Sequence, residues 1–521
     1  MTVQNKQRYR FSEAPIWNIQ RKYYEEEGMK AWNNDQVPQY ITSNPMIATA
    51  YAEMIFGFLQ DRAHKDQSEP VFIVELGAGA GRLGHHVLQE LCQLRDYAGI
   101  SLPPFRYIMT DLVINNVLAW REHPALQSFI AEGLLDFARF DAVHDTVLNL
   151  VESGVTISEG DLKQPLIIVA NYFFDSIPQE LLYIGDGEMY EAEVFVEYPK
   201  GTDVLKPSKW LDQISLNYEY RRAPEYEQEN YPYRNVIAMY QEELEDSHIL
   251  FPAAGLTCLE RLNQLSQAGF LLITADKGDH LLDQWKFAEP PELILHGSFS
   301  LTANYHAIQH VFEQRGAAVL FPPHHYKNIN VGCIFNIDKP MDYANTRLAY
   351  RRSIERFGPD EFFSLKEWVD LNLESMGLQQ ILSFWRLGKY DAEFLIQSAK
   401  QISSLLPDAN DEEKQDLLRG MQLMWSSYYV MEQRYDLALD AGLLLFEMDL
   451  YEESKNFLEI SLHQSQDEVE STVYYCLSIC CFELELDEEA LKYIRKFLEL
   501  EPDHKEALAL LSHFELQPDL T

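Results

Sequence analysis

Short apolar runs alternate with amphipathic stretches through the first two thirds of the chain. Residues 71–76, 105–110 and 165–170 are runs rich in apolar and β-branched residues, typical of strands buried on both faces of a parallel sheet. Residues 82–94, which follow the first run, place Leu and Val at helical spacing. This alternation predicts an α/β fold with a mostly parallel sheet.

Further segments complete the predicted domain. A short strand is expected at 135–140 and later strands at 269–274 and 332–337, so that the α/β domain spans residues 66–338. Helical segments in residues 1–65 predict an N-terminal helical arm. Residues of about 180–260 are rich in Tyr, Glu, Pro and Arg, which predicts an inserted lobe; a plain surface loop is the alternative.

The last third of the chain has a different pattern. From about residue 362 the sequence is almost continuously helical, and residues 450–458 parallel residues 486–494 at a spacing of 36. After a linker at 339–361, residues 362–521 are therefore predicted to form degenerate tetratricopeptide-like helical repeats. Such stacks present concave surfaces to peptides, so they could recruit a protein substrate or partner, although a scaffold is also possible.

Composition narrows the function. The 521 residues carry a formal net charge of -40, which disfavours a nucleic-acid substrate and favours basic proteins or small molecules. We expect a cytoplasmic protein, because the N-terminus is polar and long apolar runs are missing. Six cysteines indicate reduced thiols, and the histidine pairs lack the spacing of a metal site, so we expect no metal.

A glycine-rich turn follows the first strand. Glu75, Gly77, Gly79 and Gly81 match the acidic and glycine pattern of class I S-adenosylmethionine methyltransferases, in which backbone approaches the cofactor closely. Gly79, Gly81 and Gly84 also match a dinucleotide motif, but that match begins two residues late. The carboxylate at Glu75 suits a cofactor with an amino group and a sulfonium. A tight turn without a ligand remains the third possibility.

Two carboxylates stand at the ends of the next two strands. Asp111 follows strand 105–110, where a carboxylate can accept hydrogen bonds from both ribose hydroxyls of a nucleoside cofactor. By the same logic Asp141, after strand 135–140, could accept from the adenine amino group. Each residue could equally be a helix cap.

Residues 171–178 form the second informative stretch. Asn171 stands at a strand end, aromatic residues follow, and the carboxylate of Asp175 comes four residues later. These groups could form an acceptor pocket beside a methyl donor, with an ordinary strand exit as the alternative.

Residues 171–178, Asn-Tyr-Phe-Phe-Asp-Ser-Ile-Pro, resemble the Asn-Glu-Phe-Phe-Asp-Ala-Leu-Pro signature of the MidA family, which is related to the mitochondrial complex I assembly methyltransferase. Residues 40–45 and 297–305 are similar to two further family segments, and the resemblance covers about residues 20–335. It implies a class I methyltransferase fold with an inserted lobe, S-adenosylmethionine as cofactor and a protein arginine as acceptor. It also implies cofactor contacts at Gly77, Gly79, Gly81, Asp111 and Asn171, and matches Asp175 to the family's aspartate.

The chain departs from the family on the acceptor side. Tyr172 replaces a glutamate, and residues 275–278 replace an Asp-Tyr-Gly segment. We therefore expect an S-adenosylmethionine-dependent methyltransferase that acts on a protein side chain, with arginine favoured and Asp175 catalytic. A non-catalytic adaptor on a methyltransferase-like fold and a nicotinamide-dependent oxidoreductase are the alternatives.

Overall fold

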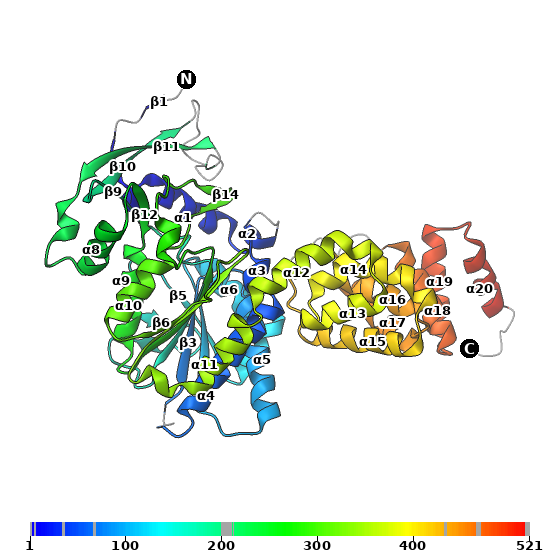
Figure 1. Cartoon of the computed structure of the whole chain (residues 1–521). Helices are drawn as coiled ribbons and strands as arrows, with labels where there is room; N and C mark the ends of the chain where they lie inside the picture. The colour runs from blue at the N-terminus through cyan, green and yellow to red at the C-terminus, as the bar shows by residue number, and fades with distance from the viewer. Residues whose placement is uncertain are drawn as a thin grey trace. The chain divides into compact units, whose positions relative to one another are not determined.

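The computed structural model describes residues 3–4, 7–33, 37–65, 69–198, 211, 213–431, 435–464 and 470–515. The chain divides into two compact units, Met1–Leu365 and Lys366–Thr521, whose elements are labelled in Figure 1. Among the described helices, none is long and apolar enough to cross a membrane.

The first unit is built on a seven-stranded sheet. Its strand order is β16-β17-β13-β8-β3-β4-β5, in which the five strands from β13 to β5 run parallel. β17 runs antiparallel to both of its neighbours. The strands are β3 (Val71–Leu76), β4 (Phe105–Asp111), β5 (Leu135–Arg139), β8 (Leu166–Asn171), β13 (Gly269–Asp276), β16 (Ala318–Leu320) and β17 (Asn330–Ile337). The predicted α/β class with a mostly parallel sheet is confirmed, and it is consistent with a methyltransferase fold.

Helices cover both faces of this sheet (Figure 1). On one face lie α4 (Pro45–Arg62), α5 (Arg82–Ala98) and α11 (Ala344–Tyr350); on the other lie α9 (Ala253–Leu265) and α10 (Tyr305–Gln314). A Cβ added to Gly57 of α4 would lie 2.8 Å from the Asn345 carbonyl carbon, so α4 and α11 pack backbone against backbone. Residues 339–361, predicted as a linker, thus include a helix that packs on the domain.

A second, antiparallel sheet is formed mainly by residues within the predicted insertion. It contains β9 (Glu180–Gly185), β10 (Glu188–Tyr198), β11 (Ser215–Arg222) and β12 (Ser247–Phe251), and β1 (Val3–Gln4) and β2 (Tyr9–Arg10) pair with β10. Residues 199–210 and 212 of the insertion lie outside the described residues. One hydrophobic core joins the two sheets, because Val74 and Ile168 belong to the same buried cluster as Leu182 and Val194. That shared core fixes the second sheet beside the first.

The N-terminal arm contains α1 (Pro15–Glu27), α2 (Lys30–Asn33) and α3 (Tyr40–Ser43) ahead of α4. Pro15 occupies the first turn of α1, where its missing N–H costs nothing, and Gly28 ends the helix with a φ of 52°. The chain therefore turns sharply after α1, which brings α2 back toward the central sheet.

The second unit is all helical. Its helices are α13 (Leu378–Leu387), α14 (Ala392–Leu405), α15 (Asp411–Ser426), α16 (Leu437–Glu447), α17 (Tyr451–Gln464), α18 (Ser471–Glu483), α19 (Asp487–Leu500) and α20 (Lys505–Glu515), after α12 (Pro359–Asn372). Lys389, Asp449 and Glu485 occupy the tight turns of three helix pairs with φ of 60°, 61° and 59°. The same left-handed turn thus recurs between paired helices. The tetratricopeptide identity of these repeats remains a prediction.

Candidate active site

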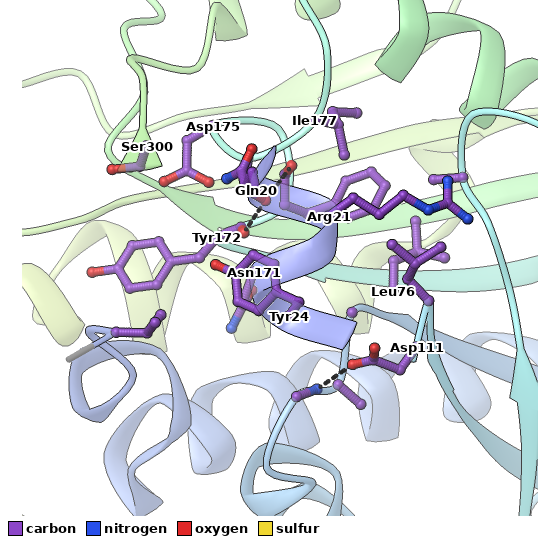
Figure 2. Close-up of a pocket in the computed structure, with 18 of the residues that line it drawn as sticks. Gln20, Arg21, Tyr24, Leu76, Asp111, Asn171, Tyr172, Asp175, Ile177 and Ser300 are labelled. Atoms are coloured by element: carbon purple, nitrogen blue, oxygen red, sulfur yellow. Dashed lines mark hydrogen bonds between the residues drawn. The ribbon is translucent and has the colours of Figure 1, made fainter. Parts of the chain in front are cut away.

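A cavity of about 630 Å³ opens at the carboxyl ends of the parallel strands. Its walls include Leu76 of β3, Asp111 of β4 and Asn171 of β8 (Figure 2). Asp141, which follows β5, also lines the cavity. The volume falls within the roughly 300–1,000 Å³ typical of small-molecule sites. The position is the crevice in which open α/β sheets bind ligands.

The glycine turn forms one wall of this cavity. Gly77 and Gly79 line it with φ of 65° and 55°, and Gly81 starts α5 with a φ of 82°. A Cβ added to Gly79 would lie 3.0 Å from the Trp32 ring. Positive φ and the close Trp32 ring together restrict position 79 to glycine.

Asp111 holds this turn in place. Its Oδ2 accepts a hydrogen bond from the Gly79 amide at 3.1 Å, and its Oδ1 accepts one from the Val113 amide at 2.8 Å. Burial raises the pKa of Asp111 to about 6. The following helix, α6 (Ile114–Glu122), is capped by Val113 without a side-chain hydrogen bond, so the helix-cap alternative for Asp111 is wrong. The Asp111 side chain lines the cavity, where the predicted ribose contact stays a prediction.

Glu75 lies at the floor of the cavity. Tyr107 donates its hydroxyl to Glu75 Oε2 at 3.1 Å, and burial raises the pKa of Glu75 to about 8. A Cβ added to Gly84 would lie 2.8 Å from the same oxygen. Gly84, the third glycine of the dinucleotide motif, is thus needed here so that α5 can approach Glu75.

Asp141 is buried at the rim and already paired. Arg21 of α1 donates to its Oδ2 at 2.7 Å, and the Val143 amide donates to its Oδ1 at 3.0 Å. Burial alone would raise the pKa of Asp141. The Arg21 guanidinium and the other hydrogen bonds have the larger combined effect and lower the pKa below its usual value. The adenine contact predicted for Asp141 stays a prediction.

Asn171 connects the cavity wall to the arm. Tyr51 donates its hydroxyl to Asn171 Oδ1 at 2.6 Å, and Asn171 Nδ2 donates to the Thr42 carbonyl at 3.1 Å. The side chain lines the cavity, yet its amide is engaged by α3 and α4. Its predicted cofactor contact would have to be made beside these two bonds.

The opposite wall carries Asp175 and Tyr172 (Figure 2). Asp175 is 4% exposed, and its Oδ1 receives no hydrogen bond from a described donor. Tyr172 has a φ of 46°, which is uncommon for a bulky residue, and its buried hydroxyl has no hydrogen-bond partner among the described residues either. Backbone strain beside unpaired polar groups is typical of functional sites.

The arm supplies walls that the sequence analysis did not assign to the site. Gln20 donates to the Phe299 carbonyl at 2.7 Å, and Tyr24 shares a hydrogen bond with Ser298 at 2.8 Å. Tyr24 also stacks on Trp32 with ring centroids 5.7 Å apart. The aromatic and charged character of residues 16–32 was visible in the sequence, but its position over the glycine turn was not.

A possible metal cluster lies elsewhere in the described part of the chain. His324, Asp360 and Glu361 could approach one ion. The Asp360 carboxylate, however, already accepts hydrogen bonds from the amides of Lys327, Asn328 and Ile329. This group caps a loop and carries no argument for a metal.

The cavity suits S-adenosylmethionine better than a dinucleotide. Glu75 and Asp111 stand at the turn. A pyrophosphate normally binds backbone amides at such a turn, and here it would also meet these two carboxyl groups. A cofactor with an amino group, a sulfonium and ribose hydroxyls instead offers cations and donors to these acceptors. Gly79 leaves room for backbone contact, because a larger residue would meet Trp32.

A comparison with protein families agrees with this fit. Residues 52–279 match the model of a family described as putative S-adenosyl-L-methionine-dependent methyltransferases. No curated protein matches the chain. Two solved structures from Burkholderia thailandensis are similar: an uncharacterized superfamily protein, 14% identical with a TM-score of 0.39, and an inferred methyltransferase bound to S-adenosylhomocysteine, 15% identical with a TM-score of 0.41. Each comparison covers 64% of this chain and 90% of the other.

Proposed function

We propose that this S-adenosylmethionine-dependent methyltransferase, acting in the cytosol, transfers the cofactor's methyl group to an arginine side chain of a protein. The observation that supports an arginine acceptor is the state of Asp175. It is a buried carboxyl on the cavity wall, and its Oδ1 has no hydrogen-bond donor among the described residues. A guanidinium supplies several N–H donors and a positive charge, which are what such a carboxyl lacks.

The two walls of the cavity suit different tasks. Gly77, Gly79 and Asp111 would hold the cofactor, which supplies an electrophilic methyl group when bound. Asp175 would orient the acceptor nitrogen toward that group. Positioning of two reactants in a closed cavity can contribute on the order of 7–11 kcal/mol to a displacement of this kind.

Label transfer tests the assignment. The full chain is incubated with methyl-tritiated S-adenosylmethionine and proteins from cells in which its gene is deleted, so that acceptors are unmethylated. We expect label in protein, and mass spectrometry of digested peptides should place it on arginine. Label on another residue type would contradict the arginine assignment, and label in small molecules alone would contradict a protein acceptor.

The helical unit would recruit that acceptor. A formal net charge of -40 favours a basic protein, and paired helices can present a binding surface. A chain that ends at Leu365, the boundary of the first compact unit, should keep its affinity for S-adenosylmethionine and methylate the protein with a higher KM. An unchanged KM would contradict recruitment. A partner that binds the helical unit and is never methylated would favour the adaptor.

A further inference from the structure

Asp175 has a second buried carboxyl beside it. Asp276 ends β13, the strand next to β8, and it is 0% exposed. The Asp175 amide donates to Asp276 Oδ2 at 3.2 Å, and the two carboxyl groups lie within hydrogen-bonding reach of each other. The carboxyl ends of the neighbouring parallel strands β8 and β13 thus bring the two carboxyl groups close together.

One oxygen of each carboxyl lacks, among the described residues, the partner that a buried carboxylate normally has. Neither Asp175 Oδ1 nor Asp276 Oδ1 receives a hydrogen bond from a donor in the described residues. The nearby basic side chain, Lys277, is exposed to solvent. Two ionised carboxylates in contact and out of water would repel each other strongly, so one of them must carry a proton.

The surroundings favour a cation at this point. The titratable side chains that face the pair, besides Lys277, are the tyrosines Tyr24, Tyr51, Tyr172, Tyr305 and Tyr326. Each has its pKa raised by burial, and the charge of Asp175 or Asp276 raises it further, so all five are neutral hydroxyls at neutral pH. Aromatic rings around a negatively charged carboxyl pair favour a cation over an anion.

We propose that Asp175 and Asp276 form a proton-sharing pair that binds the cationic acceptor side chain and takes up the proton released when the methyl group is transferred. The proposal deepens the proposed function, because it adds Asp276 to the acceptor wall. Burial and the neighbouring carboxylate raise the pKa of Asp276 well above its usual value, and burial raises that of Asp175. A single shared proton leaves the free pair with one negative charge, and a bound guanidinium stabilises the second charge, so that the shared proton leaves when the cation binds.

The acceptor nitrogen forms a bond to the methyl carbon, while the carbon–sulfur bond breaks and leaves its electron pair on sulfur. While the cation is bound both carboxyls are ionised, and the methylated nitrogen loses one proton to the pair, which thereby regains its single shared proton. That proton passes to water when the next acceptor cation binds. An arginine remains a cation throughout, so the pair keeps its counterion until the proton arrives.

Binding of a small cation tests the pair without an identified protein acceptor. Radiolabelled methylguanidinium is dialysed against the full chain saturated with S-adenosylhomocysteine, and the proton released on binding is titrated in weakly buffered solution at pH 7. We expect release of about one proton per cation, because the bound cation allows both carboxyls to ionise. Asp276→Asn should abolish the release and weaken binding by about tenfold, the loss of one charge-assisted hydrogen bond.

The matched control is Asp279→Asn. Asp279 lies three residues beyond Asp276 and is hydrogen-bonded to Gln284 at 2.5 Å, so its loss should leave the release unchanged. Affinity for S-adenosylhomocysteine reports whether each variant is folded. If Asp276→Asn does not bind S-adenosylhomocysteine, Asp175→Asn is tested in its place. The same loss of proton release is expected.

Several results would overturn the pair. They are methylguanidinium binding to the wild-type chain without proton release, wild-type release in Asp276→Asn, or a wild-type chain that binds neither methylguanidinium nor methylammonium. Binding of methylammonium alone, with a release that needs Asp276, would support the pair and overturn arginine as the acceptor. Failure of the proposed function is thereby distinguished from failure of the pair.

Discussion

The two walls of the cavity differ in how their carboxyl groups are satisfied. On the cofactor wall, Asp111 accepts two amide hydrogen bonds and Asp141 accepts hydrogen bonds from Arg21 and the Val143 amide. On the acceptor wall, Asp175 Oδ1 and Asp276 Oδ1 receive no hydrogen bond from a described donor. Carboxyls that already accept hydrogen bonds form a rigid site, whereas buried carboxyls without a partner are stabilised when a cation binds them. In the proposed function the cofactor wall is therefore preformed, and the acceptor wall is completed by its ligand.

Gly79→Arg should break the cofactor wall entirely. Position 79 has a φ of 55°, and even a Cβ would lie 3.0 Å from the Trp32 ring, so the arginine must displace the arm or the turn. We expect calorimetry to detect no S-adenosylmethionine binding. Wild-type affinity in this variant would mean that the cofactor binds elsewhere. An NADH titration of the wild-type chain, for which we expect no heat, checks the oxidoreductase alternative.

Asp175→Asn should separate the two walls. The substitution keeps the size of the side chain but removes its charge, so affinity for S-adenosylmethionine should stay near normal while methyl transfer falls by about two orders of magnitude, as for one positioned catalytic group. Turnover and calorimetry are measured on the same preparation. A parallel loss of cofactor affinity would make Asp175 a structural or cofactor residue, and unchanged turnover would move the acceptor elsewhere.

Asp111→Ala should weaken the cofactor wall without abolishing it. The variant loses the acceptor for the Gly79 and Val113 amides, and with it the predicted ribose contact, so we expect S-adenosylmethionine to bind about tenfold more weakly. Asp111→Asn keeps one acceptor oxygen and should show a smaller loss. Equal affinities in the alanine variant and the wild type would show that the turn does not depend on Asp111.

Glu75→Gln should change stability with a defined pH dependence. The pKa of Glu75 is raised from 4.5 to about 8, so the folded state holds the proton more tightly than the unfolded state. The stability that the proton provides is present below pH 4.5 and is lost as pH rises through about 8. Without cofactor, the free energy of unfolding of the variant should therefore exceed that of the wild type at pH 8 by on the order of 2–4 kcal/mol. At pH 5 the two free energies should be nearly equal. A difference independent of pH would contradict this assignment.

The sequence predicted best what neighbouring residues determine. The strand from Val71 to Leu76, the glycine turn after it and the position of Asp111 at a strand end follow from local pattern, and the structure has them there. The pairing of Asp175 with Asp276 joins residues 101 positions apart, and it depends on β8 and β13 being neighbours. Trp32 over Gly79 likewise depends on how the arm folds back.

The second sheet shows the same limit. β9 and β10 form a hairpin within the predicted insertion, but β12 and the N-terminal β2 join it from more distant parts of the chain. Their pairing is set by the core shared with the central sheet, which periodicity alone does not reveal.

A crystal structure of the full chain with S-adenosylhomocysteine tests the division into two walls most directly. The account predicts the adenosine against Gly77 and Gly79, the ribose hydroxyls at Asp111, and the sulfur facing Asp175. A ligand bound outside this cavity, or bound in it with the sulfur turned away from Asp175 and Asp276, would contradict the account.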